Sequence, residues 1–283
     1  MNLHKPINYK NIKKITDLEF HKILYDCGVR DNFCVAVSGG PDSLALYFLA
    51  KNYAIKNNYR FSVITVDHKL RKNSKEEVNW LRALFKKDKT KHHILRWNGL
   101  KPKNNLMASA RNKRYELINS KCVELGAKYL LTAHHLDDQI ETFFMRLVRG
   151  SGIKGLASIM RKSKMKKMIL IRPLLNYSKK SLIKILAEKK QYYIEDPTNK
   201  NISFDRIRYR KIISSLIDEG IDKYRLNKLI SNLSQANIAV DYLSKTELKN
   251  CLSQNKYGHI QIKKEIFFKL PREVQFRILN FLI

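Results

Sequence analysis

A hexapeptide between an apolar run and a helical pattern constrains the fold of this chain more than any other stretch. Residues 33–37 are apolar and predict a buried strand, whereas residues 44–50 follow a helical pattern. The hexapeptide between them is Ser38-Gly39-Gly40-Pro41-Asp42-Ser43. Its glycine pair lets the backbone turn tightly, so that N–H groups and the helix N-terminus approach a bound anion. We therefore expect a strand–turn–helix unit with a phosphate-binding turn.

The acidic residue of this turn, Asp42, limits which type of phosphate-binding site the hexapeptide can form. A carboxylate repels a phosphate unless a cation such as Mg²⁺ lies between them. No Gly-Lys-Ser/Thr follows at the Walker spacing, so the hexapeptide predicts a pyrophosphate cradle of another type, with the hydroxyls of Ser38 and Ser43 at its rim. The alternative is an ordinary tight turn with serine or aspartate capping, because turns and anion sites use the same residue types.

The charge balance points to a polyanionic partner. The 283 residues include 56 basic and 25 acidic side chains, which gives a net charge of +31. Nucleic acid is the first candidate, although an AT-rich genome would also enrich lysine and asparagine. No apolar stretch is long enough to span a bilayer and residues 1–14 lack the apolar core of a signal peptide, so we expect a cytoplasmic protein without a membrane partner. The four cysteines form no Cys-x-x-Cys pair, so we expect no zinc site and no iron–sulfur cluster.

Predicted strands and helices alternate over the first part of the chain. The strands are predicted at 33–37, 60–67, 93–97, 129–133 and 168–175. Ser74 and Glu77 predict a capping box for the helix that follows the second strand. This alternation predicts an α/β fold with a parallel, five-stranded, doubly wound sheet. From about residue 212 helical patterns dominate, with one short strand at 259–262, which predicts a small helical C-terminal domain.

Polar clusters follow three of the predicted strands. Residues 38–43 come after the first strand, Asp67 and His68 end the second, and His134 and His135 follow the fourth. In parallel sheets, ligands bind beyond the carboxyl ends of the strands. The three clusters therefore predict one site and not three.

The densest polar cluster lies between residues 132 and 142. It contains two histidines and three carboxylates: His134, His135, Asp137, Asp138 and Glu141. On a helix, Asp138 shares a face with Glu141 and Thr142. We rank Mg²⁺-assisted phosphate chemistry first, a transition-metal hydrolase second and helix capping by acidic residues third.

Two groups of arginines suit anionic ligands. Arg111 and Arg114 lie three residues apart on a predicted helix, a spacing that suits clamping of a phosphate or carboxylate. Arg206, Arg208 and Arg210 would share a face in a strand and splay in a helix. With the tyrosine among them, they suit an RNA backbone and base stacking. The alternative for both groups is a solvated basic surface.

Several stretches, taken in order, resemble one family of PP-loop ATP pyrophosphatases, the tRNA(Ile)-lysidine synthetases. The resemblance covers about residues 33–210, and the matching stretches are Ser-Gly-Gly-Pro-Asp-Ser (38–43), Val-Asp-His-Lys-Leu-Arg (66–71), Ala-Arg-Asn-Lys-Arg-Tyr (110–115), Ala-His-His-Leu-Asp-Asp-Gln (133–139), Arg-Gly-Ser-Gly (149–152), Arg-Pro-Leu-Leu (172–175) and Glu-Asp-Pro-Thr-Asn (195–199). One departure is Lys69, where the family often has glycine. Longer relatives carry a further tRNA-binding module after the helical segment, and we expect that module to be absent here.

The resemblance implies an ATP- and Mg²⁺-dependent carbon–nitrogen ligase. The carbonyl of the wobble cytidine in the CAU anticodon of tRNA(Ile) would attack the α-phosphate of ATP. Free L-lysine would then displace AMP through its ε-amine, which gives lysidine and changes decoding from AUG to AUA. The implied fold is that of PP-loop ATPases, or adenine nucleotide alpha hydrolase-like. It would have a PP-loop ATP-binding catalytic domain at 1–215 and a helical tRNA-binding domain at 216–283.

The resemblance also implies roles for the matched residues. ATP would contact Ser38, Gly39, Gly40, Pro41, Asp42, Ser43, Asp67 and His68, and the metal ligands would be Asp42 with Asp137 or Asp138. The catalytic set would be Asp42, Asp137, Asp138, Glu141, Arg111, Arg114, His134 and His135. Within this set, the arginines would contact phosphate or the adenylate. Asp138 and Glu141 would handle the lysine amine, and the histidines would support these two carboxylates. The tRNA would contact Arg206, Arg208 and Arg210.

Three other functions remain as alternatives. Thiolation of a tRNA cytidine needs paired cysteines for a cluster or persulfide relay, and the sequence has no such pair. An amide-forming synthetase would not need the strong positive charge. A non-enzymatic RNA-binding protein is disfavoured, because a carboxylate-rich site repels RNA unless Mg²⁺ and ATP occupy it. The sequence leaves the oligomeric state open, with a homodimer as one option.

Overall fold

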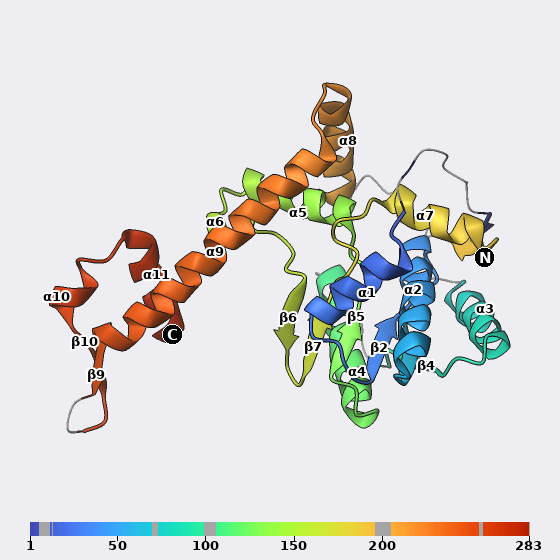
Figure 1. Cartoon of the computed structure of the whole chain (residues 1–283), viewed down its shortest axis with the longest axis horizontal. Coiled ribbons are helices and arrows are strands. Elements are labelled where there is room, and N and C mark those ends of the chain that lie inside the picture. Colours follow the sequence, from blue (N-terminus) through green and yellow to red (C-terminus); the bar gives the residue numbers. More distant parts are fainter. Residues whose placement is uncertain are drawn as a thin grey trace. The chain divides into compact units, whose positions relative to one another are not determined.

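The computed structural model describes residues 1–5, 12, 14–69, 73–98, 106–195, 205–254 and 257–282, without the side chains of 107, 108 and 205–207. The chain folds into two compact units (Figure 1). The first comprises Met1–Glu141 and Met160–Glu219, and the second comprises Thr142–Ile159 and Gly220–Ile283. As a division of function, the predicted boundary between residues 215 and 216 stays a prediction.

A six-stranded sheet forms the centre of the first unit, in the order β4-β3-β2-β5-β7-β6. Its parallel strands are β4 (His92–Arg96), β3 (Phe61–Asp67), β2 (Phe33–Ala36), β5 (Tyr129–Leu131) and β7 (Met168–Ile171). Val35 of β2 pairs with Val63 on one side and Leu131 on the other. The strand that leads into the hexapeptide therefore lies in the middle of the sheet, and the predicted parallel sheet is confirmed.

The edge strand β6 (Lys162–Met165) was not predicted from the sequence. It pairs antiparallel with β7, and its residues alternate between exposed and half-buried. The exposed positions are Lys162 and Lys164, and lysine on an edge strand discourages pairing with another chain. A strand of this kind lacks the apolar run by which the other strands were predicted.

Helices cover both faces of the sheet because both faces are apolar. On one face, Phe33 and Val35 share a core with α1, α2, α3 and α7, whereas on the other face Cys34 packs with Ile118 and Cys122 of α4. Successive β2 side chains therefore enter different cores, which confirms the doubly wound arrangement. The helices of this unit are α1 (Asp17–Asp26), α2 (Pro41–Asn57), α3 (Ser74–Lys87), α4 (Leu106–Glu124), α7 (Lys179–Glu188), α8 (Asp205–Asp218) and the start of α5 (Leu136–Val148).

The predicted capping box on Ser74 and Glu77 is wrong. Helix α3 begins at Ser74, so the cap position falls on Asn73, which makes no side-chain cap bond. A serine that is already the first helical residue lies one position too late to cap. The capping box observed in this unit joins Thr16 and Glu19 at the start of α1.

A small second sheet supports the hexapeptide from outside the main sheet. Strand β1 (Leu3–His4) pairs antiparallel with β8 (Tyr193–Ile194). The N–H of Ile194 donates to the carbonyl of Gly39 at 2.9 Å, and the Ile194 side chain is buried. Residues from both ends of the first unit therefore hold the turn between β2 and α2.

The second unit is mainly helical, as predicted for the C-terminal region. Its elements are the end of α5, α6 (Ile153–Leu156), α9 (Lys223–Cys251), β9 (Leu252–Gln254), β10 (Ile260–Ile262), α10 (Lys264–Phe267) and α11 (Arg272–Leu282). Strand β10 matches the predicted short strand and pairs antiparallel with β9. A core of Cys251, Phe267, Val274 and Ile278 joins α9, α10 and α11. Within the described residues, no helix has both the length and the apolar character to span a membrane.

Candidate active site

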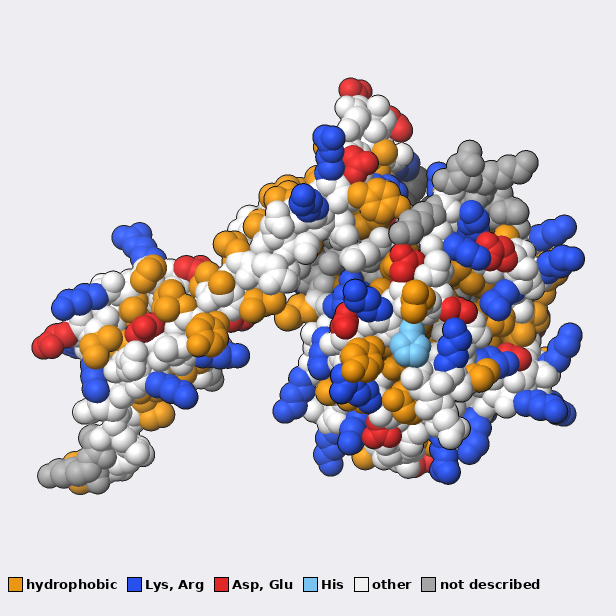
Figure 2. All heavy atoms as spheres, in the orientation of Figure 1, with side chains coloured by type: hydrophobic (Ala, Val, Ile, Leu, Met, Phe, Trp, Pro, Cys, Tyr) orange, Lys and Arg blue, Asp and Glu red, His pale blue; other side chains and the backbone are white. Residues whose placement is uncertain are grey.

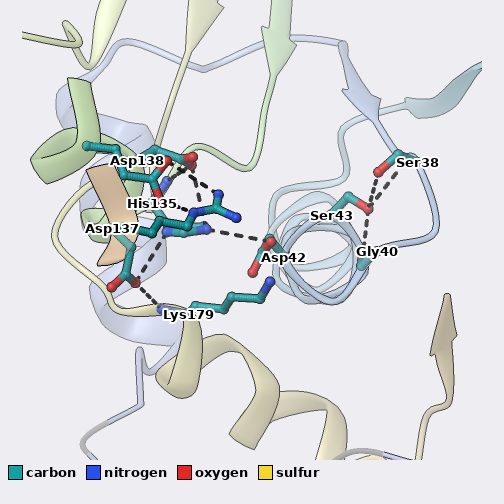
Figure 3. A network of polar contacts seen from close by, with 10 residues as sticks. Ser38, Gly40, Asp42, Ser43, His135, Asp137, Asp138 and Lys179 are labelled. Atoms are coloured by element: carbon teal, nitrogen blue, oxygen red, sulfur yellow. Dashed lines mark hydrogen bonds and ion pairs between the residues drawn. The ribbon is translucent and has the colours of Figure 1, made fainter. Parts of the chain in front are cut away.

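The hexapeptide forms a tight turn between β2 and α2 (Figure 3). Gly40 is the N-cap of α2 and makes no side-chain cap bond, and Pro41 is the first helical residue. The Ser43 hydroxyl donates to the carbonyl of Gly40 at 2.9 Å and accepts the N–H of Ser38 at 3.2 Å. The serines therefore shape the loop and do not cap the helix. A helix start without a side-chain cap offers its first N–H groups to an anion.

Gly39 is required by the conformation of this turn and by its neighbour. Its φ is +89°, in the left-handed region that favours glycine. A Cβ at this position would lie 2.5 Å from Cδ1 of Ile194, which is closer than unbonded carbon atoms come. The Ile194 side chain of β8 thus packs against the turn at the place where a Cβ of residue 39 would lie.

Three carboxylates surround His135, the residue that precedes α5. The Nε2 atom of His135 lies 3.6 Å from Oδ2 of Asp42 and 3.6 Å from Oδ2 of Asp138. Its Nδ1 atom lies 3.5 Å from Oδ2 of Asp137. In Figure 3, Asp42 reaches this group from α2, whereas Asp137 and Asp138 belong to the first turn of α5. Polar residues that follow β2 and β5 therefore lie in one site.

The charge of His135 follows from these neighbours. The side chain is 7% exposed, and burial by itself lowers the pKa of an imidazole. Asp138, Asp137 and Asp42 outweigh burial and raise the pKa of His135 well above its ordinary value. The ring is therefore positively charged at neutral pH, and this charge offsets part of the repulsion among the three carboxylates.

Two of these carboxylates also stabilise helix starts. Asp138 Oδ2 accepts the N–H of His135 at 3.0 Å, and Asp137 Oδ2 accepts the N–H of Lys179 at 2.8 Å. Asp138 thereby supports the start of α5 and Asp137 the start of α7. The capping alternative is thus observed, but the same oxygens also face His135.

The carboxylates fit Mg²⁺ on one side of the imidazole. Oδ1 of Asp42 is buried and has no hydrogen-bond partner among the described residues, and Asp42 and Asp138 both face Nε2 of His135. Asp137 faces the other ring nitrogen. Mg²⁺ usually takes one or two protein carboxylates together with substrate phosphates. Among the described residues, no group of three or more His, Cys, Asp or Glu side chains is arranged to hold a metal ion.

His134 is neutral, unlike its neighbour. Burial is the main cause that lowers its pKa, to about 3, and although Asp138 acts in the opposite direction, three positive charges add to the effect of burial: Arg172, Arg111 and Arg114. Because the two arginines of α4 are close enough to affect the pKa of His134, they belong to the same site as the carboxylates. A neutral imidazole there can donate or accept a hydrogen bond without adding charge.

The arginines of α4 pack around one tyrosine. The guanidinium carbons of Arg111 and Arg114 lie 5.3 Å and 5.1 Å from the ring centroid of Tyr115, within the range of cation–π contacts. Arg172, at the end of β7, donates from Nη1 to the carbonyl of Met160 at 2.6 Å, and its Nε is buried with no hydrogen-bond partner in the part of the chain that the structure describes. Arg172 belongs to one of the matched motifs but had no predicted role, although a charged residue directly after an apolar strand was a usable signal.

Glu141 and Arg210 form an ion pair that sequence reasoning did not predict. The side chain of Glu141 is 5% exposed and binds Nε of Arg210, with Nη2 at 3.3 Å. Arg210 belongs to the helix α8, which corresponds to the helical alternative for this segment. Arg208 is exposed, and the side chain of Arg206 lies outside the described residues. Two residues predicted for different roles therefore meet in one pair.

The second polar cluster ends β3 at the same edge of the sheet. Oδ1 of Asp67 accepts the N–H of Lys69 at 2.9 Å, and His68 packs edge-on against Trp97. Lys69 has a φ of +51°, a conformation that glycine adopts without strain, which accounts for the glycine often found there in the family. Leu70, Arg71 and the predicted motif at 196–199 lie outside the described residues.

Comparisons with known proteins agree with these features. A family model for the PP-loop domain matches residues 12–217. The tRNA(Ile)-lysidine synthase of Bradyrhizobium diazoefficiens is 42% identical over 212 residues, which cover 74% of this chain and 59% of that protein. The tRNA(Ile)-lysidine synthase of Wolbachia pipientis wMel is 34% identical, with 94% and 63% covered. The enzyme of that name from Rhodopseudomonas palustris is 35% identical, with 94% and 78% covered.

The coverage of the relatives is uneven. The chain spans about three fifths of the length of the first two, at 59% and 63%. Among solved structures, the U34-tRNA thiolase NcsA from Methanococcus maripaludis with its [4Fe-4S] cluster is similar, with a TM-score of 0.64, 16% identity and 77% of this chain and 78% of that chain covered. At this identity the similarity concerns the fold alone. The PP-loop match supports the use of ATP, one of the two cofactors predicted from the sequence.

Proposed function

The chain belongs to the tRNA(Ile)-lysidine synthase family, and from this premise we propose that it joins free L-lysine to the wobble cytidine of a tRNA(Ile) with a CAU anticodon. The observation that carries the proposal is the contact between the phosphate-binding turn and the start of α5, where Asp42 and Asp138 face the same nitrogen of His135. An adenylating ligase needs a pyrophosphate cradle and acidic groups side by side. Mg²⁺, lysine and the tRNA are parts of this proposal.

In the first step, the carbonyl oxygen of the cytidine would attack the α-phosphate of ATP. The bond between the α-phosphorus and its bridging oxygen would break, and pyrophosphate would leave from the N–H groups of the hexapeptide turn. Arg111 and Arg114 would contact the phosphate or the adenylate, and neutral His134 would contribute a hydrogen bond. Mg²⁺ held by Asp42 and Asp138 would neutralise phosphate charge.

In the second step, the lysine ε-amine would attack the base carbon that carries the adenylate. A carbon–nitrogen bond would form, AMP would leave, and the amine would lose its proton to a base, because only the neutral amine is nucleophilic. Asp138 and Glu141 are the proposed acceptors, since they lie three positions apart on one face of α5. The ion pair with Arg210 fixes the position of the Glu141 carboxylate.

Charge and exposed aromatic side chains support a role of the second unit in tRNA binding. On the face drawn in Figure 2, Lys and Arg side chains are spread over both units. In the second unit, Tyr242 is 75% exposed and Phe276 is 70% exposed. Exposed aromatic rings beside basic side chains provide stacking surfaces for unpaired bases. We therefore assign tRNA binding to residues 216–283 together with Arg206, Arg208 and Arg210.

The proposed reaction is tested by incubating the protein with ATP, Mg²⁺, radiolabelled lysine and tRNA(Ile) that carries a CAU anticodon. Label in acid-precipitable RNA is expected. Asp138→Asn removes a proposed metal ligand that is also a proposed proton acceptor, so it should lower the rate of labelling by about a hundredfold or more. Asp26→Asn, which changes an exposed aspartate at the end of α1, is the matched control and should keep the wild-type rate.

An Asp138→Asn enzyme that labels tRNA at the wild-type rate would refute the role of this carboxylate. Exchange of label between pyrophosphate and ATP separates the remaining functions. A protein that only binds RNA would show no exchange, and an amide-forming synthetase would show it without tRNA. A lysidine-forming enzyme should require tRNA for exchange.

A further inference from the structure

The phosphate-binding turn contains no basic side chain of its own. Asp42 is the only charged residue in the hexapeptide, whereas a Walker loop includes a lysine that reaches the β- and γ-phosphates. Bound ATP would add its own negative charge to that of Asp42. A site of this kind needs a positive side chain from another element, in addition to a metal ion.

The start of α7 lies at this site. Lys179 is the first residue of α7, and its backbone N–H donates to Oδ2 of Asp137 at 2.8 Å. In the other direction, the N–H of Leu136 at the start of α5 donates to the carbonyl of Tyr177 at 2.9 Å. Two hydrogen bonds therefore anchor the start of α7 to the start of α5, and one of them involves Asp137, a carboxylate that faces His135.

The side chain of Lys179 extends from this anchor towards Asp42, as Figure 3 shows. The residue is half-buried, and among the described residues no hydrogen bond or ion pair engages its ammonium group. The next residue, Lys180, is exposed. Partial burial restricts a lysine side chain at a cost in conformational entropy. A restricted ammonium group that points to the phosphate-binding turn is an arrangement suited to an incoming anion.

We propose that Lys179 is a phosphate-binding residue of the ATP site and that its ammonium contacts the phosphates that leave as pyrophosphate. The inference rests on the proposed function in one respect, namely that ATP is the nucleotide held at the turn. Lys179 then supplies from α7 the positive charge that the hexapeptide lacks. As a flexible point charge, it accommodates both bound ATP and the departing pyrophosphate.

The test compares nucleotide binding to the wild-type protein and to Lys179→Met, Lys179→Arg and Lys180→Met. Methionine keeps a long stem and removes the charge, and the backbone bond to Asp137 remains. Calorimetric titrations with Mg²⁺ use α,β-methylene-ATP and AMP as probes. Lys179→Met should weaken binding of the ATP analogue by about tenfold or more, as for loss of a charged hydrogen bond, and leave AMP binding within about twofold. Lys179→Arg should retain most of the affinity, and Lys180→Met should retain all of it.

Unchanged binding of the analogue to Lys179→Met would overturn the proposal. So would equal weakening of AMP, because the contact would then not involve the leaving phosphates, or equal weakening by Lys180→Met, which would indicate a general charge effect. Thermal unfolding verifies each fold, and Lys179→Gln replaces the methionine variant should that one unfold. A wild type that binds the analogue but transfers no lysine would contradict the proposed function and leave this inference standing. A wild type that does not bind it would overturn both.

Discussion

Replacement of Gly39 by alanine should destabilise the first unit through two separable effects. The φ of +89° places a side chain in the left-handed region, at a cost of about 1–2 kcal/mol. The new Cβ would also lie 2.5 Å from Cδ1 of Ile194. Rotation of that buried side chain away from its rotamer costs about 0.5–1.5 kcal/mol. Alanine also lowers the conformational entropy of the unfolded chain, which stabilises the folded state by roughly 0.5 kcal/mol. We therefore expect the free energy of unfolding to fall by about 2 kcal/mol in total.

The two tryptophans make this loss measurable in the first unit. Trp80 and Trp97 are the two tryptophans of the chain, and both lie in that unit. Chemical denaturation followed by their fluorescence therefore reports on the sheet domain that holds the turn. Gly40→Ala is the matched control, because Gly40 has a φ of −70° and a Cβ there would meet no atom closer than 3.8 Å. This control should cost less than about 1 kcal/mol, the difference between glycine and alanine at an N-cap.

A second substitution separates the steric effect from the backbone effect. Ile194→Val removes the Cδ1 atom that the new Cβ would meet, and by itself it should cost about 0.5–1.5 kcal/mol. Combined with Gly39→Ala, it should restore roughly 0.5–1 kcal/mol relative to the sum of the single losses. The left-handed φ would still weaken the turn. Equal stabilities of Gly39→Ala and Gly40→Ala, or strictly additive losses with Ile194→Val, would refute this reasoning.

Three further predictions concern buried polar groups. Tyr47 is fully buried and donates its hydroxyl proton to Asp88, so Tyr47→Phe should lower the stability of the first unit by about 1–2 kcal/mol, as measured by tryptophan fluorescence. Arg277→Met should destabilise the second unit by roughly 2–3 kcal/mol. This loss is smaller than for a fully buried ion pair, because Asp241 is 34% exposed. Amide exchange in α9 should become faster, and unchanged exchange would contradict the prediction. Burial above all lowers the pKa of His92 to about 4, so the native state resists a proton that the unfolded state binds. The wild type should therefore lose on the order of 1–2 kcal/mol relative to His92→Gln as pH falls from about 6.5 towards 4, and parallel denaturation curves at pH 7 and pH 5 for both proteins would test it.

The parts of the fold that follow from local pattern could be predicted well. Phe33, Cys34 and Val35 are successive apolar residues, and only a strand buried on both faces accommodates them all. The glycine pair at 39–40 marked the turn that follows. Edge strand β6 escaped prediction, because its exposed lysines remove the apolar signal. Helix starts depend on a single residue position, which is why the cap expected at Ser74 falls on Asn73.

Local patterns along the chain indicate which chemical groups follow the carboxyl ends of the strands, because strands and polar motifs are each encoded in short stretches of sequence. Which of these groups meet depends on how distant segments pack together. Glu141 pairs with Arg210 across 69 positions, and Asp137 binds the backbone of Lys179 across 42. Such partners are chosen by the packing of α7 and α8 onto the sheet domain. No periodicity within a segment encodes a distance between segments, so the site had to be seen folded before its charges could be assigned to one another.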